Sequence, residues 1–430
     1  MTMPYVIPLT WSPSKDICYS VGKLVFGEAG MHYQSTVAFQ YDSQWIETGF
    51  AIGADLPLKE GIQYPNGNSL YASPWTGNRS SWFGFMKDHA PGAWLNFLLQ
   101  KPHLIGLKSI FDEPSPSALD LWLACGHNSQ HFSALTLPIN PCSDMAFESC
   151  GSSKKSLMQV AAFLSDVVDR RFNVLDGALL RLYNLSSNMG GTRPKLLAAN
   201  PSQGSDSWVV RIRDRRNPNF NDTLSMGLTA SLAKQCGIDV VDGILVTPDI
   251  YCERRYDRES NGDKRLCLSA ASLVNTQAQT REVLLGQANK VCYLDVADII
   301  NANGSSPRKD LKILWDRLAF NCLVGNAHDS LSDIWFYRSD GGWRLLPLSA
   351  PCATPSSFGF KMLATPAIRQ NTLADIETVI AVARYFGISS SKAKRRVLEL
   401  KQIISKWRPM AVELGADLHD LSALSVAFEF

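Results

Sequence analysis

A pair of glycines, Gly190 and Gly191, follows the short polar turn Ser186-Ser187-Asn188 and precedes Thr192 and Lys195. Glycine lets the main chain approach a ligand closely and direct its N–H groups at an anion. The segment therefore has the composition of a loop that cradles phosphate groups, although it fits neither the Walker pattern nor GxGxxG. A tight turn between two strands explains the same glycines, and the residues alone leave both interpretations open.

A cation, Arg211, lies on the next apolar segment, Trp208–Ile212, which reads as a strand. Kinase-type folds place a lysine on such a strand, where it holds the nucleotide phosphates. A guanidinium group also binds phosphate, with a larger and differently shaped fork. Because further arginines follow at Arg213, Arg215 and Arg216, a solvated basic edge is the alternative interpretation.

A polar loop follows the apolar segment that ends at Val324 and carries Asn326, His328, Asp329 and Asp333. Titratable groups gathered after an apolar helix are typical of a catalytic loop, but Asn, Asp and Ser also favour ordinary helix ends and turns. A Ser-His-Asp relay is not expected, because neighbours in sequence rarely meet in relay geometry.

The elements that would position these residues follow from periodicity. Apolar and polar positions alternate in the first 150 residues, and helical spacing dominates after about residue 266. We expect an α+β protein with three segments, 1–150, 151–265 and 266–430, the first boundary lying in a Pro-, Cys-, Gly- and Ser-rich stretch. Predicted strands are 19–26, 35–41, 208–212, 243–246, 251–255 and 334–337; predicted helices are 93–99, one starting near 155, 224–236, 309–324, 379–386, 392–407 and 418–428.

Composition narrows the function classes only slightly. The 430 residues are 45% hydrophobic and carry a net charge of +2, which excludes a disordered chain and gives no bulk attraction to nucleic acid or membrane. The ten cysteines form no CxxC pair, so neither a zinc site nor a disulfide framework is indicated. Without an apolar signal or membrane segment, we expect a cytoplasmic protein.

Six motifs, in this order, resemble the HipA family of bacterial Ser/Thr kinases, the toxins of HipBA-type toxin–antitoxin pairs. The resemblance runs over nearly the whole chain and implies a two-lobed kinase fold with an N-terminal α+β subdomain. The motifs are Gly22-Lys23-Leu24 through Leu56-Pro57-Leu58, Asp88 to Trp94, Gly190-Gly191-Thr192-Arg193-Pro194-Lys195, Arg255-Tyr256-Asp257-Arg258, Leu345-Leu346-Pro347-Leu348 and Trp407-Arg408.

The resemblance also implies where the kinase residues should lie, and several are replaced. The strand lysine falls on Arg211, and its partner glutamate falls near Met226 or Gly227, neither of which pairs with a cation. The family's general base falls on His328. One metal ligand falls on Asp333 and the other on Ala350, which offers no oxygen to a metal. The loop serine that active members autophosphorylate falls on Asn188.

Three functions follow from this pattern. The first is a HipA-like pseudokinase that binds an antitoxin-like or regulatory protein, with residual ATP affinity through Asn188, Gly190, Gly191, Thr192, Lys195 and Arg211. The second is a divergent, active kinase toxin in which Asp329 is the base and Asp333 holds Mg²⁺. The third is a DNA-associated co-repressor that acts with an antitoxin, supported by the basic runs Arg211–Arg216 and Lys392–Arg396. Direct sequence-specific DNA binding is not expected, because no helix-turn-helix module is recognisable.

Overall fold

The computed structural model describes residues 5–14, 16–26, 37–65, 82–90, 92, 132–136, 154–168, 193–199, 207–215, 217–259, 261–274, 291–355, 361–369 and 371–428. They belong to two compact units. The first comprises residues 1–207 and 257–280, and the second comprises 208–256 and 281–430. The predicted segment boundaries at 150 and 265 stay predictions.

The first unit is built on an antiparallel sheet of order β3-β2-β1-β4. Burial alternates from Gly22 to Phe26 along β2, with Leu24 and Phe26 buried and Lys23 exposed, as the alternating sequence predicts. Val21 is also buried, where the pairing of β1 and β2 shifts register. Gly22 is required there, because a Cβ at this position would lie 2.3 Å from the carbonyl oxygen of Gln40 on β3. The strands are β1 (Tyr5–Trp11), β2 (Tyr19–Phe26), β3 (Val37–Tyr41) and β4 (Leu135–Thr136).

Helix α5 shows the predicted amphipathic pattern, since Leu157, Val160, Ala161 and Leu164 are all buried. A buried carboxylate also stabilises this unit: Asp88 at the end of α2 accepts bonds from the backbone N–H and the hydroxyl of Ser269. The remaining elements are α1 (Ser43–Thr48), α2 (Gly84–Asp88), α5 (Lys154–Val168), β5 (Lys195–Ala199), β9 (Cys267–Ser269) and α8 (Ala270–Leu273).

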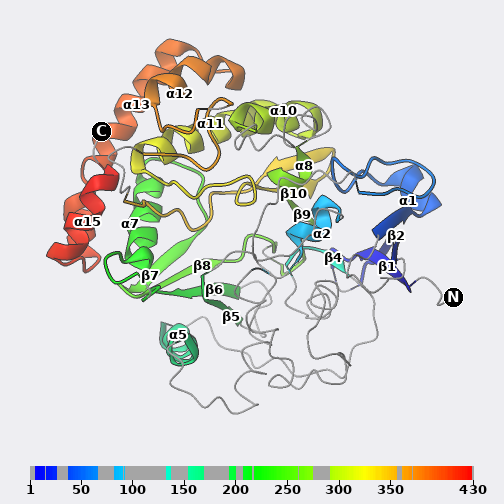
Figure 1. The fold of residues 1–430 in the computed structure, drawn as a ribbon, viewed down its shortest axis with the longest axis horizontal. Helices are drawn as coiled ribbons and strands as arrows, with labels where there is room; N and C mark the ends of the chain where they lie inside the picture. Colours follow the sequence, from blue (N-terminus) through cyan, green and yellow to red (C-terminus); the bar gives the residue numbers. More distant parts are fainter. Residues whose placement is uncertain are drawn as a thin grey trace, which may run out of the picture. The chain divides into compact units, whose positions relative to one another are not determined.

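The second unit contains the antiparallel strands β6 (Ser207–Ile212), β8 (Ile250–Arg254) and β7 (Gly243–Thr247), in that order. Helix α7 (Asp222–Gln235) packs against β7 and β8 (Figure 1). It begins at Asn221, whose side-chain oxygen accepts the N–H of Leu224 at 3.1 Å, a normal N-cap. The helix is buried along most of its length, so it belongs to the core of this unit.

The rest of the second unit is mainly helical, around the long, largely buried helix α11 (Pro307–Val324). Pro307 occupies the first turn, and Gly325 ends the helix in the left-handed conformation at φ 64°, the usual asymmetry of helix ends. Figure 1 shows α12 and α13 beside α11. The other elements are α10 (Tyr293–Asn303), β10 (Trp335–Ser339), β11 (Gly342–Leu345), α12 (Ile376–Val382), η6 (Ala383–Phe386), α13 (Ser390–Ile404), α14 (Trp407–Glu413) and α15 (Leu418–Phe428).

The α+β class predicted from the sequence is confirmed, and so are the individual elements that fall on described residues. Two agree at both ends, β2 and α15, and most others differ by one to four residues. The helix predicted at 93–99 lies outside the described residues. Every helix in the described part of the chain is too short or too polar to cross a bilayer.

Candidate functional site

The strand cation Arg211 is buried and paired. Its Nη2 lies 2.6 Å from Oε1 of Glu253 on the neighbouring strand β8, and the two residues are 8% and 0% exposed. The interpretation of Arg211 as part of a solvated basic edge is therefore wrong. The antiparallel register explains the pair: Arg211 stands opposite Tyr251, and Glu253 is two residues further along β8 on the same face.

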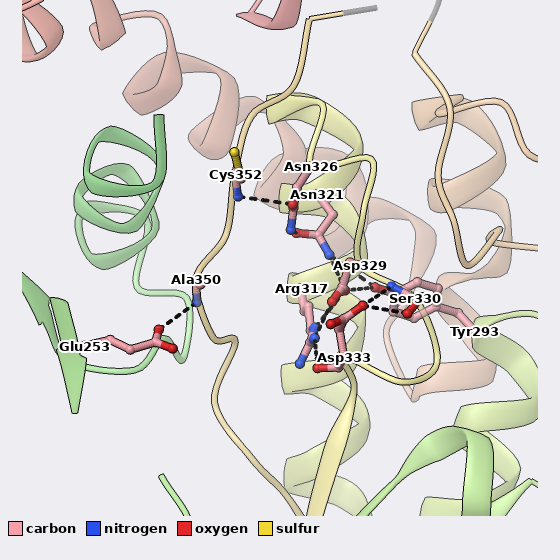
Figure 2. Close-up of polar contacts among 10 residues, drawn as sticks. All are labelled: Glu253, Tyr293, Arg317, Asn321, Asn326, Asp329, Ser330, Asp333, Ala350 and Cys352. Atoms are coloured by element: carbon pink, nitrogen blue, oxygen red, sulfur yellow. Dashed lines mark hydrogen bonds and ion pairs between the residues drawn. The ribbon is translucent and has the colours of Figure 1, made fainter. Parts of the chain in front are cut away.

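Glu253 also binds the segment that carries Ala350 (Figure 2). Its Oε2 accepts the backbone N–H of Ala350 at 2.8 Å, and its Oε1 accepts the hydroxyl of Ser349 at 2.7 Å. One buried carboxylate thus joins the strand cation to Ala350, the residue on which the resemblance places the second metal ligand. Three donors therefore bind Glu253: Arg211 and Ser349 at Oε1, and the N–H of Ala350 at Oε2.

The helix position expected to carry the partner glutamate has no room for one. A Cβ on Gly227 of α7 would lie 2.9 Å from Cβ of Leu245 on β7, closer than real Cβ atoms approach one another. Met226 is 1% exposed and packed in the core. The counter-charge of Arg211 therefore comes from a strand, and helix α7 packs tightly on the sheet instead.

Asp329 lies in a buried polar network (Figure 2). Its Oδ2 accepts bonds from Tyr293 Oη at 2.7 Å, Asn321 Nδ2 at 2.6 Å and Arg317 Nε at 2.9 Å. Its Oδ1 accepts a further bond from Nη2 of Arg317. A carboxylate offers about four acceptor positions, and four donors bind this one, three at Oδ2 and one at Oδ1. Burial first, and then the Asp329 carboxylate, raise the pKa of the Tyr293 hydroxyl well above its ordinary value, so the phenol stays protonated as a donor.

The same network continues to the segment after Ala350. The side-chain amide of Asn326 donates to Oδ1 of Asn321 at 3.0 Å, and its own Oδ1 accepts the N–H of Cys352 at 3.1 Å. Asn321 in turn donates to Asp329. A hydrogen-bonded chain therefore runs from the polar loop through α11 to Cys352 (Figure 2).

The other two loop residues of the predicted site, His328 and Asp333, are exposed. Oδ2 of Asp333 accepts the N–H and the hydroxyl of Ser330 at 3.1 and 2.5 Å, which closes a local turn. Ala350 offers no oxygen, and the carboxylates of Asp329 and Glu253 already accept four and three protein donors. This donor set does not fit a two-metal phosphoryl-transfer centre.

A cluster able to hold a metal occurs elsewhere in the described residues, at Asp417, His419 and Asp420. The carboxylates of Asp417 and Asp420 each accept the other's backbone N–H, at 2.8 and 3.2 Å, where α15 begins. Reciprocal capping of a helix start accounts for this cluster.

The glycine-rich loop is not part of the described structure. Asn188, Gly190, Gly191 and Thr192 lie outside the described residues, so their nucleotide contacts stay predictions. Lys195 opens strand β5 and is half-buried. Its place in a phosphate site is also untested.

Sequence reasoning missed three residues of this site: Glu253, Arg317 and Tyr293. Glu253 and Arg317 lie on the predicted elements 251–255 and 309–324, but no motif marks them. Tyr293 opens α10, for which no separate helix was predicted. The sequence does contain a signal for Arg317, because a charged residue at an otherwise apolar position of a buried helix requires a partner of opposite charge. The identity of that partner depends on the fold.

Comparison with known proteins agrees with this architecture. Residues 187–407 match the model of the HipA-like C-terminal domain. The chain also superposes on HipA of Shewanella oneidensis MR-1, solved with HipB and operator DNA, at a TM-score of 0.62 and 15% identity, covering 98% of this chain and 95% of that one. A Helicobacter pylori proinflammatory kinase, CtkA, gives a TM-score of 0.37 and 13% identity over 56% of this chain and 91% of that one. No curated protein matches the sequence.

The whole-chain superposition confirms the HipA-like kinase fold that the motifs implied. The family match adds the evolutionary relationship, because it extends over just over half of the chain and includes the polar loop, Arg211 and Ala350. The protein belongs to the HipA-like C-terminal domain family.

Proposed function

We propose that this protein is a HipA-fold pseudokinase of toxin–antitoxin type that acts in the bacterial cytoplasm by binding a protein partner. The observation that carries the proposal is the double use of Glu253. This one carboxylate neutralises Arg211, the residue at the phosphate-holding position, and binds the N–H of Ala350, the residue at the metal-ligand position. Phosphoryl transfer depends on positioned cations, and the residues here neutralise or lack them.

The competing function is a divergent kinase in which Asp329 is the general base. A base must accept the substrate's proton, and a protonated Asp329 would no longer counter the charge of Arg317, which is 2% exposed. Leaving a buried charge without its partner costs about 3–5 kcal/mol. The ion pair with Arg317 therefore favours a positioning role for Asp329.

A phosphotransfer assay separates the two functions. Purified protein is incubated with γ-labelled ATP and Mg²⁺, with a general protein substrate, and label is followed on both proteins. We expect no incorporation above that of Asp333→Ala. ATP-dependent labelling that Asp333→Ala abolishes would contradict the pseudokinase proposal. Calorimetry measures the affinity for ATP with and without Mg²⁺. We expect weak binding that Mg²⁺ does not strengthen.

The partner part of the proposal draws on the Shewanella HipA structure, which contains HipB and operator DNA. We infer that this chain likewise binds an antitoxin-like protein. Co-expression with any helix-turn-helix protein encoded beside it, followed by size-exclusion chromatography, tests this. Co-elution as one complex supports the inference, and elution of two separate species contradicts it.

The same structure favours a second candidate function, a co-repressor that associates with DNA through its antitoxin. Direct contact by the basic run of α13 has less support, because Arg396 pairs with Asp316 at 3.0 Å and lies 3.7 Å from Glu399. We expect the isolated chain to bind operator-length DNA weakly and in a salt-dependent way. Gel-shift assays measure the affinity of wild type and Lys394→Ala for this DNA, each with and without the antitoxin.

A further inference from the structure

The segment Ala350–Thr354, called here the latch segment, has all of its backbone N–H groups bonded to residues outside it. Ala350 donates to Glu253, Cys352 to Asn326 Oδ1, and Ala353 to Oγ1 of Thr229 at 3.1 Å. Thr354 donates to the carbonyl oxygen of Gly325 at 3.0 Å. Pro351 has no N–H group. The backbone donors of the latch segment are therefore satisfied by the protein alone.

Helix α7 holds this segment from a second side. Besides the bond from Ala353 to Thr229, the hydroxyl of Ser225 donates to the carbonyl oxygen of Ala353 at 2.6 Å. Ser225, Thr229 and Ala353 are each fully buried. Both polar groups of one latch residue thus bind two side chains that lie one helical turn apart on α7.

We propose that these bonds form a latch, which fixes helix α7, strand β8 and the segment after β11 in one arrangement without nucleotide or metal. A buried hydrogen bond is costly to leave unmade, so neither α7 nor the latch segment moves alone without exposing several unpaired groups. The strained backbone of Ala350, at φ 42°, is held by the same set of contacts. The latch includes Ala350 and Glu253 of the proposed pseudokinase site. It does not depend on the pseudokinase proposal, since an active enzyme could contain the same bonds.

Hydrogen exchange tests the latch directly. Amide exchange of residues 350–354 is measured in the ligand-free protein with EDTA and again with saturating Mg·ATP. We expect strong protection in the ligand-free state and the same rates with ligand. Low protection that rises on addition of Mg·ATP would overturn the latch, because ligand would then be what orders the segment.

A pair of matched variants on α7 tests the cause of the protection. Thr229→Val keeps the side-chain shape and removes the hydroxyl oxygen that accepts the N–H of Ala353. We expect the amides of Cys352, Ala353 and Thr354 to exchange about tenfold faster in this variant than in wild type. Ser231→Ala is the control, because its hydroxyl bonds within its own helix, to the carbonyl oxygen of Gly227 at 2.8 Å. Unchanged exchange in Thr229→Val would contradict the proposal. Ser225→Ala offers the same test from the carbonyl side if Thr229→Val fails to fold.

The outcomes separate this inference from the proposed function. Exchange in the absence of ATP reports the latch, and labelling from γ-labelled ATP reports catalysis. A protected segment in a protein that transfers phosphate would leave the latch standing and end the pseudokinase proposal. A latch segment that only Mg·ATP orders, in a protein without phosphotransfer, would end the latch proposal and leave the pseudokinase proposal standing.

Discussion

The backbone N–H of Ala350 donates to Oε2 of Glu253 at 2.8 Å, from a residue whose φ is 42°. Glu253 lies on β8, almost a hundred residues earlier in the chain. A non-glycine residue in the left-handed region is strained, and Ala350 also precedes a proline, which restricts its backbone further. The contact therefore fixes the backbone where the family's metal ligand would stand.

Relief of this strain is the first prediction. We expect Ala350→Gly to stabilise the protein by about 1 kcal/mol, because glycine adopts positive φ without the Cβ penalty. Chemical denaturation measures the difference. Ala353→Gly is the control, since Ala353 is fully buried and has no positive φ, and we expect it to be destabilising. Equal loss of stability in both variants would show that Ala350 is not strained.

The second prediction concerns the buried pair of Arg317 and Asp329. We expect Asp329→Asn to destabilise the protein by about 3 kcal/mol or more, because it leaves the Arg317 guanidinium buried without its counter-charge. The double variant Arg317→Met with Asp329→Leu should recover much of this loss, since no unpaired charge remains. Urea unfolding of wild type, Arg317→Met, Asp329→Leu and the double variant gives the coupling free energy.

The control for this cycle is Asp298→Asn, an exposed residue of α10, which should leave stability unchanged. The cycle also discriminates between functions. A variant Asp329→Asn of normal stability that has lost an ATP-dependent activity of the wild type would identify Asp329 as a catalytic base and not a positioning residue.

The third prediction tests whether the family's helix glutamate can be restored. We expect Gly227→Glu to lower stability by about 1–3 kcal/mol, because its Cβ would press on Leu245. Gly227→Ala should also lose stability, despite the higher helix propensity of alanine. Thermal unfolding, with Ser231→Ala on the same helix as control, measures both. Phosphotransfer gained by a stable Gly227→Glu protein would contradict the assignment of Glu253 as the partner of Arg211.

The fourth prediction is a pH dependence that arises in the first unit. Burial lowers the pKa of His89, which the nearby Asp88 carboxylate only partly offsets, and Nδ1 of His89 lies 2.6 Å from the carbonyl oxygen of Phe85. The unfolded chain takes up a proton near pH 6.5 and the folded chain does so only at lower pH. Stability conferred by neutral His89 is therefore present above pH 6.5 and is lost as the pH falls below it.

Comparison with His89→Gln isolates this contribution from that of the acidic residues. Unfolding free energies are measured from pH 7.5 down to pH 5. Between pH 6.5 and the folded-state pKa, the difference between wild type and variant should shrink by at most about 1.4 kcal/mol per pH unit. Parallel curves over the whole range would show that folding does not lower the pKa of His89 and would contradict this prediction.

The elements of the fold were predictable because they depend on local pattern. Alternating apolar residues predicted β2, and helical spacing with Pro307 and Gly325 at the ends is consistent with the whole of α11. The family resemblance was equally readable, since its motifs are short runs in a fixed order. The resemblance also predicts that Arg211, His328 and Ala350 replace kinase residues of the family, and these correspondences stay predictions.

The tertiary structure determines which side chains contact Arg211, Ala350 and Asp329. Glu253 pairs with Arg211 only because the register of β6 and β8 places them on one face, and it reaches Ala350 only because the segment after β11 passes that face. Asp329 was a candidate base by spacing, but the packing of α10 and α11 brings Tyr293, Asn321 and Arg317 onto its two oxygens. Periodicity and spacing fix which face of an element a residue occupies. The charged or hydrogen-bonding group that contacts that face depends on register and packing between elements distant in sequence. This partner determines whether a carboxylate is available to accept a proton or instead stabilises the fold.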